Sequence, residues 1–177
     1  MSPGRRAPHP CLVVDLDDVP PEGLERPLNL SPKALAALVA GDDEEAPDLT
    51  TDLTGALRLR LLPGGRLKVR GSFQVGATLA CDRCLTPASA VLTGELEESL
   101  FLAAEGGAEE AEEDVLVVTD GRVNLAGLLA EAFWLAWPYR FICRPDCAGL
   151  CLTCGADLNQ GACGCPEPAR PGLTHRP

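Results

Sequence analysis

The sequence predicts an α+β fold, in which a mainly antiparallel β-sheet or partial barrel carries two short helices and a C-terminal cysteine-rich segment. Three observations lead to this prediction. Apolar and polar residues alternate with a period of two through the middle of the chain, two segments have helical spacing, and six of the nine cysteines lie between Cys143 and Cys165. A chain of 177 residues with 46% apolar content can bury its own core, so the cysteines are not needed as cross-links.

The N-terminal part of the chain is expected to form a short strand and a short helix. The run CLVVDL (Cys11–Leu16) is apolar enough for a strand, and DDVPPEG ends it. In NLSPKALAALVAG, Ser31 is a suitable N-cap, Pro32 takes the first helical position and Gly41 follows the end.

A β-hairpin is expected next, from TDLTGALRLRLL (51–62), a PGG turn and RLKVRGSFQVGATLA (66–80). The apolar residues of its alternating pattern are expected to face the core: Leu57, Leu59, Leu61, Leu67 and Val69. The opposite face carries five cations, here called the basic strip: Arg58, Arg60, Arg66, Lys68 and Arg70.

Two further strands and a second helix complete the predicted sheet domain. ASAVLTGELEESLFL (88–102) and DVLVVTDG (114–121) are the strands, and VNLAGLLAEAFWLAWP (123–138) has helical spacing from Asn124 until Pro138 stops it.

The net charge of −11 is concentrated in two acidic segments, at about 41–50 and 103–114. Ten carboxylates in two runs within these segments, Asp42–Glu45 and Glu105–Asp114, account for nearly all of it. Both segments are expected to be solvated loops. The rest of the chain is almost balanced, so the net charge does not exclude a nucleic-acid partner.

The chain is expected to act in the cytoplasm. The apolar run after the first two arginines is shorter than the core of a secretion signal, and no stretch approaches the length of a membrane span. Thiols stay reduced in that compartment, where clustered cysteines favour metal or redox chemistry over disulfides.

The cysteine spacing predicts zinc binding. Zinc takes four ligands in a tetrahedron, and two cysteines separated by two residues can reach one ion from a tight turn. Two pairs have this spacing, and the remaining clustered cysteines can complete two sites. One expected site is Cys151, Cys154, Cys163 and Cys165, and the other is Cys81, Cys84, Cys143 and Cys147.

Two zinc ions per chain are therefore expected, although a single site with unligated thiols, and iron in place of zinc, are alternatives. The second site would staple a metal-binding tail, residues 141–166, to a sheet domain of residues 1–140, and residues 167–177 are expected to be disordered. Cys11 is left over in an apolar strand and is expected to be a buried residue rather than a ligand.

Three motifs resemble the YceD family: CDRCLTP (81–87), VNLAGLLAEAFWLAWP (123–138) and CRPDCAGLCLTCGADLNQGACGC (143–165). Within the last, GLCxxCGxDLN (149–159) is the most specific. The resemblance implies a role in the accumulation of 23S ribosomal RNA and in the biogenesis of the large (50S) subunit, in bacteria or plastids. It supplies no catalytic residues.

The residues themselves indicate a non-catalytic protein. Its two histidines, His9 and His175, lie in termini rich in proline and arginine, and zinc with four thiolates has no open position for a substrate. The expected partner is ribosomal RNA, through the basic strip and Arg83, or a large-subunit ribosomal protein or precursor particle. Neither a membrane nor a small-molecule substrate is expected. The alternative is a thiol-redox or iron–sulfur protein.

Overall fold

The computed structural model describes residues 9–40, 46–104 and 115–166. Residues 41–45 and 105–114 of the two predicted acidic loops lie outside these ranges, as does the predicted disordered tail, residues 167–177. The chain divides into two compact units. The sheet unit comprises Met1–Thr78 and Ala90–Pro138, and the cysteine unit comprises Leu79–Ser89 and Tyr139–Pro177.

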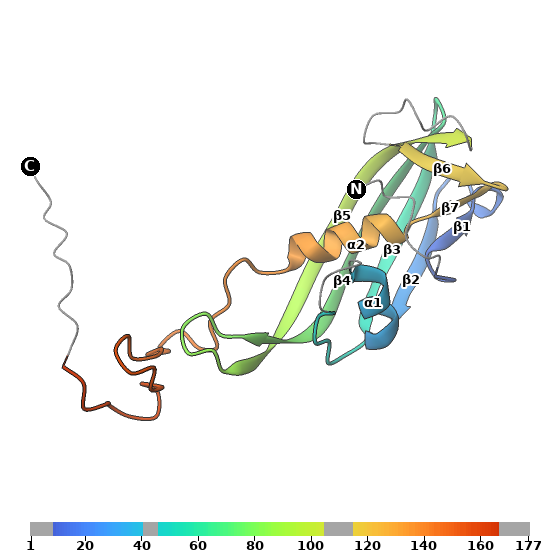
Figure 1. Cartoon of the computed structure of the whole chain (residues 1–177). Helices are drawn as coiled ribbons and strands as arrows, with labels where there is room; N and C mark the ends of the chain where they lie inside the picture. Colours follow the sequence, from blue (N-terminus) through green and yellow to red (C-terminus); the bar gives the residue numbers. More distant parts are fainter. Residues whose placement is uncertain (1–8, 41–45, 105–114, 167–177) are drawn as a thin grey trace, which may run out of the picture. The chain divides into compact units, whose positions relative to one another are not determined.

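Seven strands form one mixed sheet in the order β1-β7-β6-β5-β4-β3-β2 (Figure 1). The pairs β1/β7, β2/β3, β3/β4 and β6/β7 are antiparallel, whereas β5 and β6 run parallel. The bounds are β1 Val13–Asp15, β2 Leu24–Leu30, β3 Leu53–Leu62, β4 Arg66–Ala80, β5 Pro87–Ala104, β6 Val115–Thr119 and β7 Arg122–Asn124. The predicted α+β class with a mainly antiparallel sheet is confirmed.

The sequence pattern did not predict two of these strands. β2 contains Pro27 and charged residues, which weaken its alternation; it is an edge strand, where proline is tolerated. β7 has only three residues. β5 continues to Ala104 and therefore includes the first two residues of the predicted acidic segment, whose other residues lie outside the described ranges.

The central hairpin packs as predicted, with one exception. The apolar residues Leu57, Leu59, Leu67 and Val69 are buried. Leu61 is 37% exposed, because it lies at the end of β3 beside the turn. The core face is therefore set by the alternation, except at the end of the hairpin.

Both helices lie on the same face of the sheet (Figure 1). α1 (Pro32–Val39) begins where Ser31 Oγ accepts a hydrogen bond from the Ala34 N–H at 3.3 Å. α2 (Ala126–Ala136) buries Phe133, and its Trp134 Nε1 donates to the Val39 carbonyl at 3.1 Å, which ties the helices together. Among residues 9–40, 46–104 and 115–166, no helix combines the length and apolar character that crossing a membrane requires.

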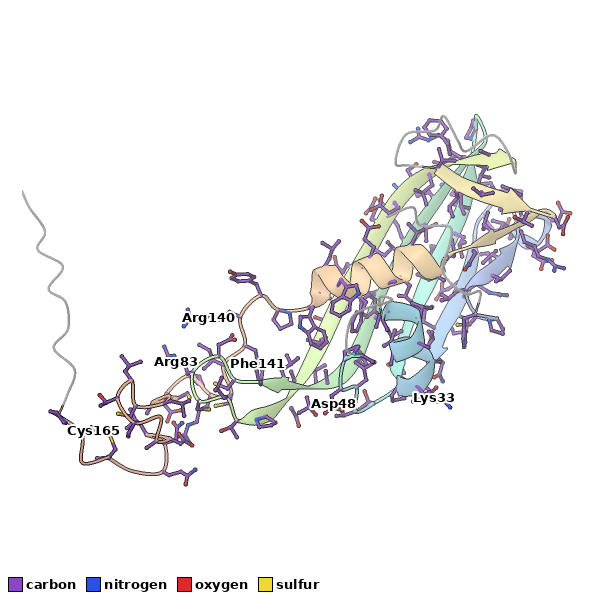
Figure 2. The ribbon with its side chains drawn as sticks, viewed as in Figure 1. Lys33, Asp48, Arg83, Arg140, Phe141 and Cys165 are labelled. Carbon is purple, nitrogen blue, oxygen red and sulfur yellow. The ribbon has the colours of Figure 1, made fainter. Side chains whose placement is uncertain are left out.

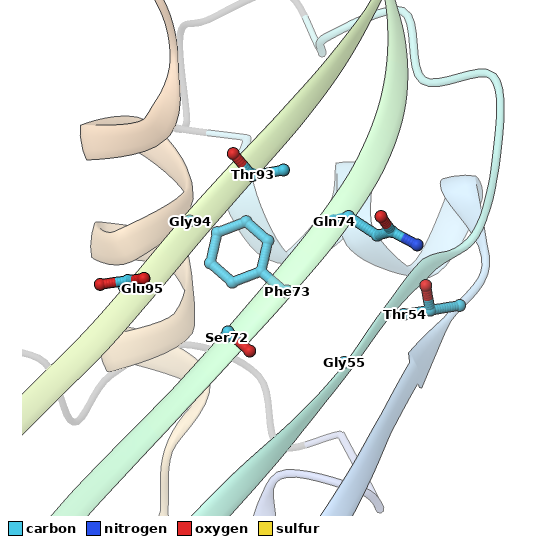
Figure 3. A pocket seen from close by; sticks show the side chains of 8 residues that line it. All are labelled: Thr54, Gly55, Ser72, Phe73, Gln74, Thr93, Gly94 and Glu95. Carbon is cyan, nitrogen blue, oxygen red and sulfur yellow. The ribbon is translucent and has the colours of Figure 1, made fainter.

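A close approach between β4 and β5 requires a glycine. A Cβ added to Gly94 would overlap the ring of Phe73, which is buried over it (Figure 3). The surrounding groove of about 510 Å³ contains one carboxylate, Glu95, and no cation or thiol among its lining residues. The groove follows from the packing of Phe73 and brings no reactive groups together.

Candidate metal centres

Eight cysteines of the cysteine unit gather into two groups of four. In each group, the four sulfur atoms all lie within 4.8 Å of one another, and each group could hold a metal ion. The first cluster is Cys81, Cys84, Cys143 and Cys147, and the second cluster is Cys151, Cys154, Cys163 and Cys165. These are the two sets of four that the spacing predicts.

The sulfur spacing in the first cluster suits a single tetrahedral ion. The Sγ atoms of Cys81 and Cys147 are 3.8 Å apart, as are those of Cys84 and Cys143. Four thiolates at about 2.3 Å from a central zinc lie about 3.8 Å from one another. These two edges therefore have the length of a zinc–thiolate tetrahedron, so the donor set fits the ion.

Each cluster begins with a C-x2-C turn, here called a knuckle, and the two knuckles share one backbone pattern. The N–H of the residue after the second cysteine donates to the carbonyl of the first at 2.8 Å, from Leu85 to Cys81 and from Gly155 to Cys151. The N–H of the first cysteine donates to a carbonyl two residues past the second, at 3.1 and 2.8 Å. Leu85 and Gly155 both have positive φ, at 60° and 73°. The same local geometry thus presents both cysteine pairs.

Backbone N–H groups prepare the first cysteine of each knuckle for metal binding. The backbone N–H of Cys143, followed by those of Cys84 and Arg83, lowers the pKa of the Cys81 thiol to about 6. In the second knuckle, the N–H groups of Cys154 and Thr153 lower the pKa of Cys151 to about 6. In each cluster, the thiolate form of this first cysteine is therefore favoured at neutral pH without any metal.

In each cluster, one of the other thiols resists ionisation when no cation is present. Burial, together with the neighbouring thiols of its cluster, raises the pKa of Cys143 to about 12. The side chain of Cys154 raises the pKa of Cys165 to about 12. Four thiolates cannot crowd together without a cation, so a metal ion entering either cluster must displace protons.

Asn159 links the chain after the second knuckle to the first cluster. Its Oδ1 accepts from the Ala148 N–H at 2.8 Å and from Arg144 at 2.9 Å. Its Nδ2 donates to the Asp157 carboxylate at 2.7 Å and lies 3.5 Å from the Cys147 sulfur. A donor in this position orients the Cys147 sulfur. Asn159 was not among the predicted site residues, although it ends the GLCxxCGxDLN motif.

The first knuckle is held by the segments around the other cysteines. Asp82 pairs with Phe141 in both directions: its N–H donates to the Phe141 carbonyl at 2.9 Å, and its carboxylate accepts from the Phe141 N–H at 2.6 Å. Figure 2 labels Phe141 and Arg83, the residue after Asp82. Arg83 donates from its guanidinium to the Cys147 carbonyl at 2.9 Å, and its own carbonyl accepts from the Leu150 N–H at 3.0 Å. Arg83, predicted to contact RNA, thus has an intramolecular role as well.

The basic strip lies on β3 and β4, where like charges face each other across the strands. Arg58 is directly opposite Arg70, and Arg60 is opposite Lys68. Four of the five cations line a groove of about 460 Å³, together with Glu22 and Leu62. Like charges in register repel each other, so this part of the sheet requires anions nearby.

Two glutamates from neighbouring strands supply much of that negative charge, and alternation alone did not reveal them. Glu25 of β2 accepts from Arg58 at 2.9 Å, and Glu97 of β5 pairs with both Lys68 and Arg70. Arg66 instead stacks over the Phe101 ring, at 4.9 Å from the centroid. In the described part of the chain, Arg60 has no carboxylate within ion-pair distance.

Cys11 belongs to neither cluster, as predicted, but it is half-buried rather than buried. Its sulfur lies 3.1 Å from His9 Nδ1, a contact that the sequence pattern does not indicate. Burial raises the pKa of the Cys11 thiol. The pair therefore lacks the lowered thiol pKa of an activated cysteine nucleophile.

Comparison with family models decides the family. The model described as large ribosomal RNA subunit accumulation protein YceD matches residues 69–173, more than half of the chain. The chain belongs to the YceD family. The matched region contains both knuckles and all eight clustered cysteines, so the resemblance seen in the motifs is confirmed.

Curated proteins of two kinds are similar to this YceD-family chain. An uncharacterized protein of Mycobacterium tuberculosis is 34% identical over 104 residues, which cover 58% of this chain and 49% of the relative. A Zea mays protein, described as large ribosomal RNA subunit accumulation protein YCED homolog 1, chloroplastic, is 29% identical over 130 residues, covering 57% and 44%. The chain thus spans about half the length of the curated relatives it matches. No solved structure matches it.

Proposed function

We propose that this chain is a non-catalytic, zinc-stabilised factor that supports ribosomal RNA accumulation and large (50S) subunit biogenesis in the bacterial cytoplasm. The observation that carries the proposal is the pair of four-thiol clusters within the region matched by the YceD family model. The printed name of the Zea mays relative points to the same process for that protein.

The metal in this proposal is zinc, with one ion in each cluster. The 3.8 Å sulfur separations and the lowered pKa of Cys81 and Cys151 support it. In the first cluster, the ion would staple the tail of residues 141–166 to the turn between β4 and β5, two strands of the sheet domain of residues 1–140. With four thiolates around it, zinc supplies a structural cross-link and positive charge at the centre of the unit.

The apolar core of the cysteine unit supports a structural role for the metal. Its buried cluster consists of Cys81, Cys84 and Cys147, with Ile142, Cys143 and Leu150 packed against them. Because thiols make up most of this core, bonds from sulfur to metal would replace the side-chain packing of an ordinary domain.

The same observations weigh against the redox and iron–sulfur alternatives. Thiolates that hold an iron–sulfur cluster bind different iron ions, which requires wider spacing than the edges of one tetrahedron. A redox-active thiol must be both ionised and accessible. Cys81 and Cys151, whose pKa values are lowered to about 6, are only 0% and 8% exposed.

In this proposal the partner is ribosomal RNA or a large-subunit ribosomal protein or precursor particle. The basic strip is the candidate RNA surface, because RNA phosphates would relieve the repulsion between its facing cations. Phosphates would have to compete there with Glu25 and Glu97. Arg60, which has no carboxylate partner in the described ranges, is the first expected contact.

Elemental analysis of anaerobically purified protein, combined with sedimentation of bacterial extracts, tests the proposal. We expect about two zinc ions per chain, and co-migration with large-subunit precursor particles. Depletion of the protein should lower 23S ribosomal RNA relative to 16S. Iron with acid-labile sulfide would contradict the metal assignment, and unchanged 23S ribosomal RNA would contradict the assigned process.

A further inference from the structure

Each knuckle carries one exposed leucine. Leu85 follows the second cysteine of the first knuckle and is 64% exposed, and Leu152 lies between the cysteines of the second knuckle and is 88% exposed. Both belong to the cysteine unit. Large apolar side chains at the tips of two turns leave apolar surface in water that a binding partner could cover.

The backbone conformation at Leu85 is unfavourable for leucine, so folding alone does not explain why an exposed leucine lies there. Its φ of 60° lies in the left-handed region, which is unfavourable for residues with a Cβ. Gly155 occupies the matching position of the second knuckle, with the same hydrogen bond and a φ of 73°. Glycine is therefore the residue that this turn prefers, and little of the Leu85 side chain is buried in return.

Direct contacts hold the two knuckles next to each other. The Leu150 N–H, one residue before the second knuckle, donates to the Arg83 carbonyl within the first knuckle at 3.0 Å. A Cβ on Gly149 would lie 3.1 Å from that same carbonyl oxygen, and its φ of 77° also suits glycine. The two leucines therefore project from adjacent turns of one compact unit.

The charge around the tips indicates the kind of partner. Among the described residues of the cysteine unit, three aspartates offset three arginines: Asp82, Asp146, Asp157, Arg83, Arg140 and Arg144. Four thiolates around a zinc ion carry a formal charge of about −2, so two such sites add about −4. Arg83 and Arg144 are also engaged within the chain, at the Cys147 carbonyl and at Asn159.

A unit with this charge repels a polyanion and attracts a polycation. The chain as a whole has the same sign, with a net charge of −11. Apolar tips on an acidic surface therefore match a basic polypeptide with apolar side chains of its own better than they match RNA.

We propose that Leu85 and Leu152 dock an apolar segment of a basic polypeptide, such as a large-subunit ribosomal protein. The inference rests on the proposed zinc sites for the charge of the unit, and it names the partner class that the cysteine unit binds. The basic strip belongs to the sheet unit and takes no part in this docking.

The test uses the zinc-loaded full chain against individually purified basic proteins of bacterial large ribosomal subunits, with 23S ribosomal RNA as the competing probe. We expect at least one basic protein to bind, and the double variant Leu85→Gly/Leu152→Ser to bind it at least about tenfold more weakly. Val91→Ser is the matched control, because it removes a 72% exposed apolar side chain from the sheet unit. It should leave the affinity unchanged.

A second measurement shows that the variants remain folded. Because glycine suits the backbone at Leu85, Leu85→Gly should keep the zinc content and leave the thermal midpoint equal or higher. The proposal is overturned if no basic protein binds, if the double variant binds as tightly as the wild type, or if the leucines are needed only for RNA binding or self-association. A chain without zinc would contradict the metal sites. A zinc-loaded chain whose affinity for the basic protein depends on neither leucine would contradict the docking alone.

Discussion

Replacing Cys81 and Cys84 by serine should remove one zinc ion of the two expected per chain. The change leaves the first cluster with only two sulfurs, too few to hold zinc in a closed tetrahedral site. All four thiols of the second cluster come from Cys151–Cys165, so that site should stay filled.

Loss of the zinc ion from the first cluster should destabilise the cysteine unit strongly and leave the sheet unit folded. The first cluster joins cysteines that lie 66 and 59 residues apart in the sequence, so its loss releases a long-range connection. A structural zinc ion contributes on the order of 10 kcal/mol to the folding of small peptides, comparable to the whole stability of a domain. The sheet unit keeps its own core, including Leu59 and Phe133, and should remain folded.

Metal analysis and amide hydrogen exchange on the same samples measure both effects. The Leu150 N–H, which donates to Arg83, should lose its protection in the Cys81→Ser/Cys84→Ser variant, while β3 and β4 stay protected. Cys11→Ser is the matched control and should keep both ions, because Cys11 lies outside both clusters. A double variant that still holds two zinc ions, or that loses both, would refute the assignment of independent clusters.

Three further predictions address the partner, Asn159 and proton release. Neutralising the basic strip should weaken RNA binding and reduce the slope of log K against log salt by roughly 0.7–0.9 for each phosphate that the variant no longer binds; an unaltered slope would place the RNA elsewhere. Asn159→Ala should lower the zinc affinity of the first cluster about 10–100-fold in competition with a chelator, and an affinity equal to the wild type would contradict its role at Cys147. Near neutral pH, zinc binding should release fewer than four protons per cluster, because Cys81 and Cys151 have pKa values of about 6 and are already ionised. Calorimetry in buffers of different ionisation enthalpy measures this number, and four would be inconsistent with those thiolates.

The shifted pKa values of the cysteines determine how the stability of the metal-free chain changes with pH. Folding lowers the pKa of Cys81 and Cys151 from 9.0 to about 6, so their contribution to stability is complete above pH 9 and is lost as the pH falls through 6. Folding raises the pKa of Cys143 and Cys165 to about 12, so their contribution is present below pH 9 and is lost as the pH rises toward 12.

The two groups of cysteines could be predicted because the spacing within each C-x2-C pair is visible in a short stretch of sequence. A C-x2-C turn fixes its own backbone through hydrogen bonds between near neighbours, as in Cys81–Thr86 and Cys151–Ala156. Assigning the remaining cysteines then left few combinations. The role of Asn159 could not be read in the same way, because its contact with Cys147 depends on how the chain returns after the second knuckle.

The strands that bury one face could be predicted from their alternating pattern. A strand that is held by pairing with its neighbour could not. Alternation identified β3 and β4, but β2 is held by its pairing with β3 despite Pro27 in its middle. Alternation likewise placed the cations of the basic strip on one face. It could not show that Glu25 and Glu97 lie beside them, since those residues come from the strands on either side.

Metal binding and partner docking in the cysteine unit should depend on each other. The hydrogen bond between Arg83 and Leu150 helps to hold the two knuckle tips next to each other, and the first cluster joins the same segments. A partner that contacts both leucines therefore binds the metal-loaded arrangement in preference to the metal-free one. Thermodynamic reciprocity then requires the partner to raise the zinc affinity by the same factor by which zinc raises the affinity for the partner. Zinc in this unit would thus act as a structural cross-link whose strength depends on whether the partner is bound.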